Sequence, residues 1–427
     1  MSLLKELSNP EIWEQFYAYK TSLACPKDIK RQLRGFLDER KYLSVCDEIQ
    51  AVVKAPLENH FPLPRRSVIS KQSTQKKRVV YTYPNAENTV LKLLTYLMLR
   101  KYDTLFSDGL YSFRPNRSAK SAVRDLMKIQ NLQWKYSYKV DVSNYFNSIP
   151  VERLLPMLEE VLREDPELFT FLKSLLTEAY VTLRTPISTE APNPSSEDVN
   201  VKEPVKTITE EKGIMAGTPL ASFYANLYLR DMDQWFYDHG IPYARYSDDI
   251  IVFGDTEEEV RKYGEIIRVL LMEHGLSVNP QKEELRRPEE GFVFLGFYLN
   301  HDVIDVAPAS ITKMKKKMRR KARSLMRWKD QNNLPGEKAA KAFIRVFNRK
   351  LLESSMDSDL TWSYWYFSTI NTTDSLRAID HYCQECIRYL LTGTHTKARF
   401  NAKYKDFKGL GYQSLVHAYY SFTDTSK

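Results

Sequence analysis

The sequence predicts an α+β fold, in which helices pack on an antiparallel sheet and a mainly helical region follows. Residues 134–142 alternate between apolar and polar side chains, which indicates a half-buried strand. Residues 243–253 place Tyr246-Ser247-Asp248-Asp249 between two short β-forming stretches, which indicates a strand, a tight turn and a second strand. Residues 1–60 carry apolar side chains at helical spacing, and residues 301–427 look mostly helical.

Three acidic residues fall at the ends of these predicted strands. Asp141 closes the first strand on its polar face, and Asp248 and Asp249 occupy the turn. If the strands pair in one sheet, two carboxylates about 4 Å apart repel by roughly 4 kcal/mol at an effective dielectric near 20, so a cation or a proton must neutralise them. Oxygen ligands without nearby His or Cys favour magnesium or manganese, and two such ions promote in-line phosphoryl transfer. The alternative is a solvated hairpin tip.

Several motifs give the chain a resemblance to a known family. Residues 141–150 resemble the first catalytic motif of the palm in bacterial reverse transcriptases, and residues 246–249 resemble their Tyr-x-Asp-Asp box. Further segments resemble other motifs of this family, in the family's order: 78–84, 108–119, 213–233, 275–282 and 294–297. The likeness covers about residues 61–300 and implies a right-hand polymerase with RNA-directed DNA polymerase activity.

The resemblance also implies a domain order. We expect an N-terminal helical extension at 1–60, and fingers at 61–130 with a strand pair and a helix over 88–101. A palm at 131–300 and a helical thumb and C-terminal region at 301–427 would follow. Within the palm, residues 186–212 are rich in Pro, Ser, Glu and Thr, which predicts a flexible surface insertion.

The same resemblance assigns roles at the catalytic centre. Asp141 and Asp248 would be the principal ligands of two Mg²⁺ ions, with Mn²⁺ as an alternative, and Asp249 would support them. The backbone carbonyl of Val142 would also face the metal. One ion would activate the primer 3′-hydroxyl, and the other would hold the triphosphate of the incoming dNTP.

Four other residues are expected around the nucleotide. By resemblance, Tyr145 is the steric gate that excludes a 2′-hydroxyl; the alternative is a core aromatic, which is the expectation for Phe146. Lys77 and Arg78 would contact the triphosphate, since planar guanidinium groups suit phosphate oxygens. Lys282 would approach the triphosphate from the far side of the palm, or is a surface lysine.

Contacts to the nucleic acid are expected at two places. Arg114 and Arg117 would hold the template strand, or form salt bridges within the fingers. Residues 313–329 contain ten Lys or Arg and no acid, and apolar side chains recur there at three and four residues, so one helix face is apolar. In the family this is a thumb helix that grips the template–primer duplex; the alternative is a solvated basic face. The residues expected to contact phosphates are Lys313, Lys316, Lys317, Arg320 and Arg323.

Composition agrees with a nucleic-acid partner. The 427 residues carry a net charge of +9 and the pI is near 9.0. Four cysteines fit a reduced cytosol, and Cys383 and Cys386 lack the second Cys or His pair of a structural zinc site, which favours ordinary packing. With no signal peptide and no run of 18 apolar residues, we expect a cytoplasmic protein without a membrane span.

One departure bears on the subfamily. Met215-Ala216-Gly217 stands where relatives usually carry Pro-Gln-Gly, and neither a zinc-binding homing endonuclease nor the signatures of retron enzymes is found. The remaining resemblance is to defence-associated reverse transcriptases that copy a cognate noncoding RNA. It implies a structured RNA as template and scaffold and a cDNA product; the sequence does not set the oligomeric state.

Two other functions stay open: a template-independent or protein-primed DNA polymerase, and an RNA-binding, maturase-like protein. The aromatic and basic residues of 362–367 and 397–408 would bind a structured RNA or simply close the thumb.

Overall fold

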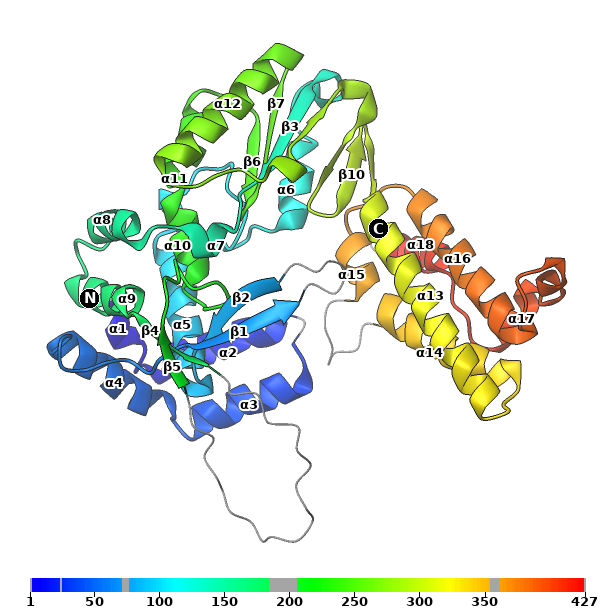
Figure 1. Cartoon of the computed structure of the whole chain (residues 1–427), viewed down its shortest axis with the longest axis horizontal. Coiled ribbons are helices and arrows are strands. Elements are labelled where there is room, and N and C mark those ends of the chain that lie inside the picture. The colour runs from blue at the N-terminus through cyan, green and yellow to red at the C-terminus, as the bar shows by residue number, and fades with distance from the viewer. Residues whose placement is uncertain (1, 24, 71–76, 184–205, 354–360, 426–427) are drawn as a thin grey trace, which may run out of the picture.

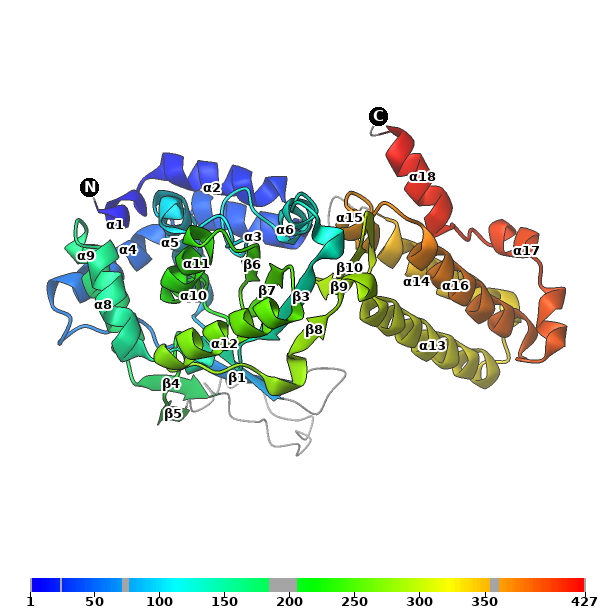
Figure 2. The same ribbon diagram turned by 90° about the horizontal axis from the view of Figure 1, so that it is seen from above.

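The protein is an α+β structure, and the part of the chain that the structure describes forms three small sheets and many helices (Figure 1). The computed structural model describes residues 2–23, 25–70, 77–183, 206–353 and 361–425. The C-terminal helices gather on one side of the molecule, and strands β9 (Phe292–Phe294) and β10 (Phe297–Asn300) lie between them and the rest (Figure 2). No helix of the described residues is both long and apolar enough to cross a membrane.

The N-terminal helices belong to the main hydrophobic core. Their bounds are α1 Leu3–Glu6, α2 Pro10–Ser22, α3 Lys27–Asp38 and α4 Tyr42–Lys54. Asn9 caps α2 by accepting a hydrogen bond from the Glu11 amide, and Pro10 occupies the first helical turn, where its missing N–H costs nothing. Trp13 and Phe16 are buried in the same core as Val90 and Phe171. The described residues between Leu3 and Lys54 are therefore mainly helical, as predicted, but they pack as part of the main body.

The first sheet has the strand order β2-β1-β4-β5. Its strands are β1 Arg65–Ser70, β2 Lys77–Thr82, β4 Tyr180–Leu183 and β5 Lys206–Thr209, and helix α5 follows β2 over Asn85–Lys101. The predicted strand pair and helix are confirmed, although the helix begins at Asn85 rather than Asn88. Most of the predicted insertion at 186–212 lies outside the described residues. Residues 206–209 lie largely on the surface, as predicted, but the expectation of a flexible segment is wrong there, because backbone pairing with β4 makes this polar stretch a strand.

The second sheet has the order β6-β7-β3-β8, and all its pairs are antiparallel. Its strands are β3 Tyr136–Asp141, β6 Tyr243–Tyr246, β7 Asp249–Gly254 and β8 Glu284–Arg286. Two helices cover it: α12 (Glu257–Glu273) lies against β3 and β7, and residues of α6 (Ala119–Leu126) pack with Ala244 and Ile251 on the other face.

Two expectations for β3 are wrong. The strand begins at Tyr136, and Trp134 lies in a 3₁₀ turn with 66% of its surface exposed. The face expected to be polar is also largely covered, since Ser137 and Asp141 are buried. The sequence of β3 alternates between apolar and polar residues, but both faces of the strand are largely buried because helices pack on both sides of the sheet.

Helices connect the strands of the first sheet to those of the second. Between β3 and β4 lie α7 Tyr145–Ser148, α8 Val151–Val161 and α9 Pro166–Thr177, and between β5 and β6 lie α10 Ala221–Tyr228 and α11 Arg230–Asp238. α10 is buried on nearly every side, which explains its almost uninterrupted apolar and aromatic sequence.

The C-terminal region has a second hydrophobic core. The third sheet, β11-β10-β9, ends with β11 (Val303–Val306), and its residues Phe297 and Val306 belong to this core. The helices are α13 Pro308–Gln331, α14 Gly336–Leu351, α15 Trp362–Tyr366, α16 Asp374–Thr392, α17 Tyr404–Gly409 and α18 Leu415–Thr425. The second core therefore begins close to the predicted boundary at residue 300.

The C-terminal cysteines and aromatics mostly fill this core. Cys383 and Cys386 are buried in α16, and burial raises the pKa of Cys386 to about 12, so ordinary packing is confirmed. Tyr366 and Phe407 are also buried, whereas Phe400 is 45% exposed. Most of these aromatics thus close the helical region.

Candidate active site

The three predicted carboxylates meet at one end of the second sheet. Asp141 is the last residue of β3 and lies opposite Asp249, the first residue of β7. Asp248 stands in the β6–β7 turn, and its carbonyl accepts a hydrogen bond from the Val142 amide at 2.9 Å. The carbonyl of Asp141 accepts another from the Asn279 amide at 2.8 Å. Antiparallel pairing therefore brings together acids that are more than a hundred residues apart.

Backbone conformation and a buried serine hold the turn. Ser247 has a left-handed φ of 60°, which lets the chain reverse between β6 and β7. Its amide donates to Ser112 Oγ at 2.9 Å, and Ser112 Oγ donates to Asn226 Oδ1 at 3.1 Å. The segment 108–119 thus supports the β6–β7 turn.

The environment of the turn disfavours negative charge. Burial and the nearby charge of Asp141 raise the pKa of Asp248. Burial raises the pKa of Asp249 to about 6. The Lys282 ammonium forms a hydrogen-bonded ion pair with Asp141 Oδ2, and the charges of Lys282 and Arg78 both partly counter the shift at Asp248. Lys282 is therefore no isolated surface lysine, and the charge of Arg78 acts on the turn.

The donor set suits a divalent cation. Three carboxylates that repel one another, in a place where burial penalises their charge, are stabilised by a hard cation such as Mg²⁺ or Mn²⁺. Among the residues that the structure describes, no three His, Cys, Asp or Glu side chains are already placed around one metal position. Lys282 instead supplies positive charge at Asp141. The carboxylate donors therefore fit Mg²⁺ or Mn²⁺, and in this structure Asp141 forms an ion pair with Lys282.

Tyr145 does not occupy the position predicted for it. Its side chain is 2% exposed, and its hydroxyl donates to the Ala225 carbonyl at 2.5 Å. A residue so enclosed cannot meet the sugar of a nucleotide, so the prediction of a steric gate at Tyr145 is wrong. Phe146 is half-exposed and packs edge-on against Phe113, with ring centroids 6.4 Å apart. The burial expected of the two aromatics is thus exchanged, because α7 directs Tyr145 into the core.

An arginine missed by sequence reasoning lies directly behind the turn. Arg245 of β6 is fully buried and donates from Nε to Asp233 Oδ1 at 2.7 Å. It also donates to the Ser247 carbonyl at 3.3 Å, while the Tyr243 hydroxyl donates to Asp233 at 2.8 Å. The available signal was an arginine inside an otherwise apolar strand, which requires a buried partner.

The two arginines expected to hold the template are held within the protein. Arg114 pairs with Asp103 at 2.7 Å and donates to the Ser107 carbonyl at 2.6 Å, and its side chain is 5% exposed. Template contact by Arg114 is therefore wrong. Arg117 forms an ion pair with Asp108 and donates to the Asp108 carbonyl at 2.8 Å. For both residues the structure shows the alternative of a salt bridge.

The segment with the variant motif lies against strand β2. The Ala216 carbonyl accepts from the Tyr81 amide at 2.8 Å, and the Ala216 amide donates to Asn147 Oδ1 at 3.1 Å. Asn147 Nδ2 also donates to the Val79 carbonyl at 3.2 Å. Asn147 therefore joins β2 to the segment 213–218 beside α7. Lys77 and Arg78 are exposed at the start of the same strand.

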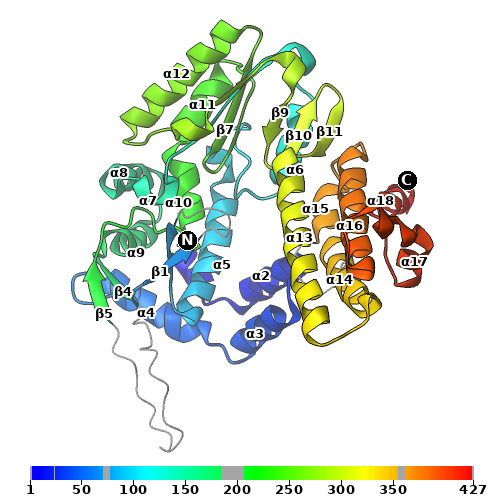
Figure 3. The same ribbon diagram turned by 45° about the vertical axis from the view of Figure 1, so that its right-hand side comes forward.

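Helix α13 has the predicted apolar and basic faces. Met314, Met318 and Ala322 are buried. Figure 3 shows α13 at the edge of the C-terminal helices nearest to the rest of the molecule. Lys317 differs from the other predicted phosphate contacts because it is half-buried, and burial and the charge of Lys350 lower its pKa. The exposed predicted residues are Lys313, Lys316, Arg320 and Arg323.

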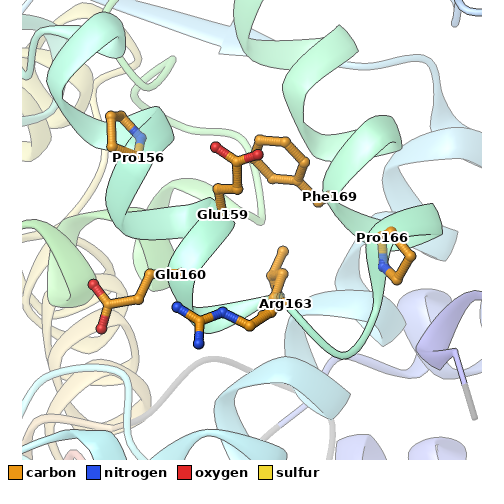
Figure 4. Close-up of a pocket in the computed structure, with 7 residues that line it drawn as sticks. Pro156, Glu159, Glu160, Arg163, Pro166 and Phe169 are labelled. Atoms are coloured by element: carbon orange, nitrogen blue, oxygen red, sulfur yellow. The ribbon is translucent and has the colours of Figure 1, made fainter.

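A hollow of about 480 Å³ lies apart from this site, between α8 and α9 (Figure 4). Glu159, Glu160 and Arg163 line it together with Phe169. None of the carboxylates of the β6–β7 turn contributes to it, and we assign it no role in the reaction.

Comparison with known proteins identifies the central region. The family model described as reverse transcriptase (RNA-dependent DNA polymerase) matches residues 69–299, more than half of the chain. An uncharacterized 91 kDa protein in the cob intron of Schizosaccharomyces pombe is 24% identical over 210 residues, which cover 48% of this chain. The chain spans 23% of the length of that curated relative.

Two solved structures show weak similarity. Apo telomerase from Candida tropicalis, truncated from its C-terminal domain, has a TM-score of 0.44 and 12% identity, covering 57% of this chain and 55% of that one. The RNA-dependent RNA polymerase of a human picobirnavirus has a TM-score of 0.38 and 13% identity, covering 56% and 43%. Because these TM-scores are below 0.5, we draw no conclusion from them about this chain.

Proposed function

Because the chain belongs to the reverse transcriptase family, we propose that it is an RNA-directed DNA polymerase with Asp141, Asp248 and Asp249 as its catalytic carboxylates. The observation that carries this proposal is the pairing of Asp141 with Asp249 across β3 and β7, with Asp248 in the adjoining turn. Further support is positive charge beside the turn, since Lys282 forms an ion pair with Asp141 and the charges of Lys282 and Arg78 both partly counter the rise that burial causes in the pKa of Asp248.

In this proposal Asp141 and Asp248 hold divalent ions, with Asp249 and the Val142 carbonyl in support. When bound, two such ions activate the primer hydroxyl and stabilise the charge on the triphosphate and the leaving pyrophosphate. Lys282 is then released from Asp141 and contacts the triphosphate together with Lys77 and Arg78. Mg²⁺ is the expected ion, because the donors are carboxylate oxygens.

We also propose a division of labour along the chain. The sheet β2-β1-β4-β5 with α5 forms the fingers, the sheet β6-β7-β3-β8 with its helices forms the palm, and the C-terminal helices form the thumb. The phosphates of the template–primer duplex contact the exposed residues predicted for this role on α13, which are Lys313, Lys316, Arg320 and Arg323. The support is their position on one exposed face, opposite the buried methionines.

At a finer level, we propose that the template is a cognate, structured noncoding RNA and that the cDNA serves in antiviral defence. The support is the sequence resemblance to defence-associated reverse transcriptases and the Met215-Ala216-Gly217 variant. The alternatives are a template-independent or protein-primed polymerase and a maturase-like RNA-binding protein. The three carboxylates weigh against the last, since a protein that only binds RNA gains nothing from acids that repel one another.

The first experiment isolates the protein expressed from its native locus and sequences its bound RNA. The protein is then given dNTPs and Mg²⁺, and the DNA product is sequenced. DNA complementary to one enriched RNA supports the proposal. DNA unrelated to the bound RNA, or a product that stays attached to protein after RNase and denaturation, would move the assignment to untemplated or protein-primed synthesis.

The matched variant is Asp248→Ala/Asp249→Ala. We expect synthesis to fall by about a thousandfold or more, because the ions contribute several kcal/mol of charge stabilisation. RNA binding should stay within about twofold, because the carboxylates do not attract phosphates. Retained synthesis would exclude these carboxylates as the metal ligands, and loss of RNA binding would indicate misfolding.

A further inference from the structure

Helices α13 and α16 pack side by side and leave a basic hollow of about 630 Å³. Its α13 side includes Lys316, Arg319, Arg320, Arg323 and Arg327, and its α16 side is Tyr389. In the views of Figures 1 and 3, α16 lies on the side of α13 away from β3, β6 and β7. Arg319 and Arg327 were not among the predicted nucleic-acid contacts.

Three of these arginines form a row along the helix. Arg319, Arg323 and Arg327 are spaced four residues apart, so they lie on one side of α13 with a rise of about 6 Å between neighbours. Among the described residues, none of the three has an ion-pair partner. The acid of the hollow, Asp330, is already paired with Lys329 at 3.0 Å. Like charges in such a row repel one another and are stabilised by a chain of anions.

An aromatic surface lies beside the row. Tyr389 is half-exposed, and its ring stacks on that of His395 with the centroids 4.1 Å apart and an interplanar angle of 6°. Tyr389 also packs partly against the C-terminal core and lines the hollow, so its ring is held in place there. Aromatic rings beside a basic groove are the combination with which proteins bind single-stranded nucleic acids.

We propose that this hollow binds a single-stranded segment of RNA, with phosphates at Arg319 and Arg327, which have no part in the proposed duplex contact, and an unpaired base on Tyr389. The choice of RNA rests on the proposed function. The hollow adds a site for RNA outside the template–primer duplex, because the bases of a duplex are stacked on one another and are not free to stack on Tyr389.

The test measures binding of a fluorescent single-stranded RNA over a series of salt concentrations. For Arg319→Gln/Arg327→Gln we expect Kd to rise about tenfold or more, and the log–log salt slope to fall by about 0.7 for each lost contact. For Tyr389→Ala we expect Kd to rise roughly fivefold or more with an unchanged salt slope, because stacking releases no counterions. Tyr389→Phe should bind like the wild type.

The matched control is Lys338→Gln/Lys341→Gln, which removes the same charge from exposed positions of α14. It should change Kd by less than about twofold, and a blunt RNA–DNA hybrid should bind the hollow variants almost as well as the wild type. Equal weakening by the control, or equal weakening for the hybrid, would overturn the proposal. The two proposals fail separately. If the wild type makes no DNA, the polymerase assignment is refuted, and weaker RNA binding by the hollow variants would still support this site.

Discussion

In the β6–β7 turn, Asp248 and Asp249 lie in surroundings that disfavour their negative charge. Burial raises the pKa of Asp248 and Asp249, and Lys282 pairs with Asp141. Asp141 and Asp249 are brought face to face by strand pairing, so the cluster cannot relax by separating. In the proposed function, a bound cation would offset the cost of assembling these charges, so the residues would serve the reaction rather than stability.

Phe146 is predicted to take the role that the sequence suggested for Tyr145. Phe146→Ala should raise the use of ribonucleotides relative to deoxynucleotides, because it removes the half-exposed ring that follows the catalytic strand. Tyr145→Phe should leave this selectivity unchanged and lower the free energy of unfolding by about 0.5–1.5 kcal/mol, since it loses the hydrogen bond to Ala225. Single-nucleotide incorporation with each nucleotide type measures the first effect, and urea unfolding measures the second. Unchanged selectivity of Phe146→Ala would exclude it as the gate.

Lys212 is a buried ammonium that should weaken the fold at neutral pH. It is 5% exposed, and its Nζ has no hydrogen-bond partner among the described residues; burial lowers its pKa to about 8. Because the folded pKa lies below the unfolded value, the cost is full below about pH 8 and disappears as the pH rises toward the unfolded pKa of 10.5. Lys212→Met should therefore raise the free energy of unfolding by about 1–3 kcal/mol at neutral pH.

Urea unfolding of Lys212→Met and wild type across this pH range is the check. The advantage of the variant should shrink between about pH 8 and pH 10. The control is Lys206→Met, a substitution at an exposed position on β5, which should change stability by less than about 0.5 kcal/mol at any pH. A constant advantage across the range would show that packing, not charge, is responsible.

At the scale of elements, the site depends on close contacts between segments distant in sequence. Asn147 of α7 hydrogen-bonds both β2 and the segment 213–218. Gly213 has a φ of +54°, and a Cβ there would lie 2.7 Å from the Asn147 carbonyl carbon and oxygen. The backbones at Asn147 and Gly213 are therefore so close together that only glycine fits at position 213 without a shift of its neighbours.

Gly213→Ala should accordingly destabilise the protein more than backbone strain alone explains. The matched control is Gly240→Ala, where φ is +64° and no atom lies within 4 Å of the added Cβ. The control should lose about 1–2 kcal/mol from the left-handed conformation, and Gly213→Ala should lose at least about 1 kcal/mol more from the clash. Denaturant midpoints of the two variants test this, and equal losses would show that the clash is relieved by movement.

At the scale of the whole molecule, the two larger hydrophobic cores of the described residues meet along the chain near residue 297, and a smaller cluster between α6 and the second sheet adjoins them. The first joins the N-terminal helices to both larger sheets. Leu3 of α1 donates its amide to Asp165 Oδ2 at 2.8 Å, and Trp13 is 1% exposed. The N-terminal helices are thus a structural part of the body that carries the carboxylates, and they should unfold with it.

Trp13→Ala tests this shared core. We expect a loss of about 3–5 kcal/mol, because a large buried ring is replaced by a cavity. Trp134→Ala is the control, since that ring is 66% exposed, and it should cost less than about 1 kcal/mol. Thermal unfolding followed by circular dichroism should show a lower midpoint only for Trp13→Ala. A separate early transition confined to a small fraction of the helix would instead indicate an independent N-terminal unit.

The sequence by itself determined the local and modular features of this protein. Alternation and turn residues located β3 and the β6–β7 turn, apolar spacing located the buried face of α13, and the ordered motifs identified the family. These signals are carried by residues that are neighbours along the chain. The same signals selected Asp141, Asp248 and Asp249 as the candidate carboxylates, because acids at the ends of apolar strands are conspicuous in the sequence. The structure brings these three acids to one end of the second sheet.

The tertiary structure decided what depends on contacts across the chain. Burial of Tyr145, exposure of Phe146 and the pairing of Arg114 with Asp103 follow from helices and loops that meet only in the folded protein. The strand formed by residues 206–209 exists because its backbone pairs with β4, which its polar composition does not reveal. The partner of a hydrogen bond or an ion pair can lie anywhere in the sequence. A sequence pattern therefore shows which residues could bind a ligand, and only the folded structure shows which of them already have a partner within the protein.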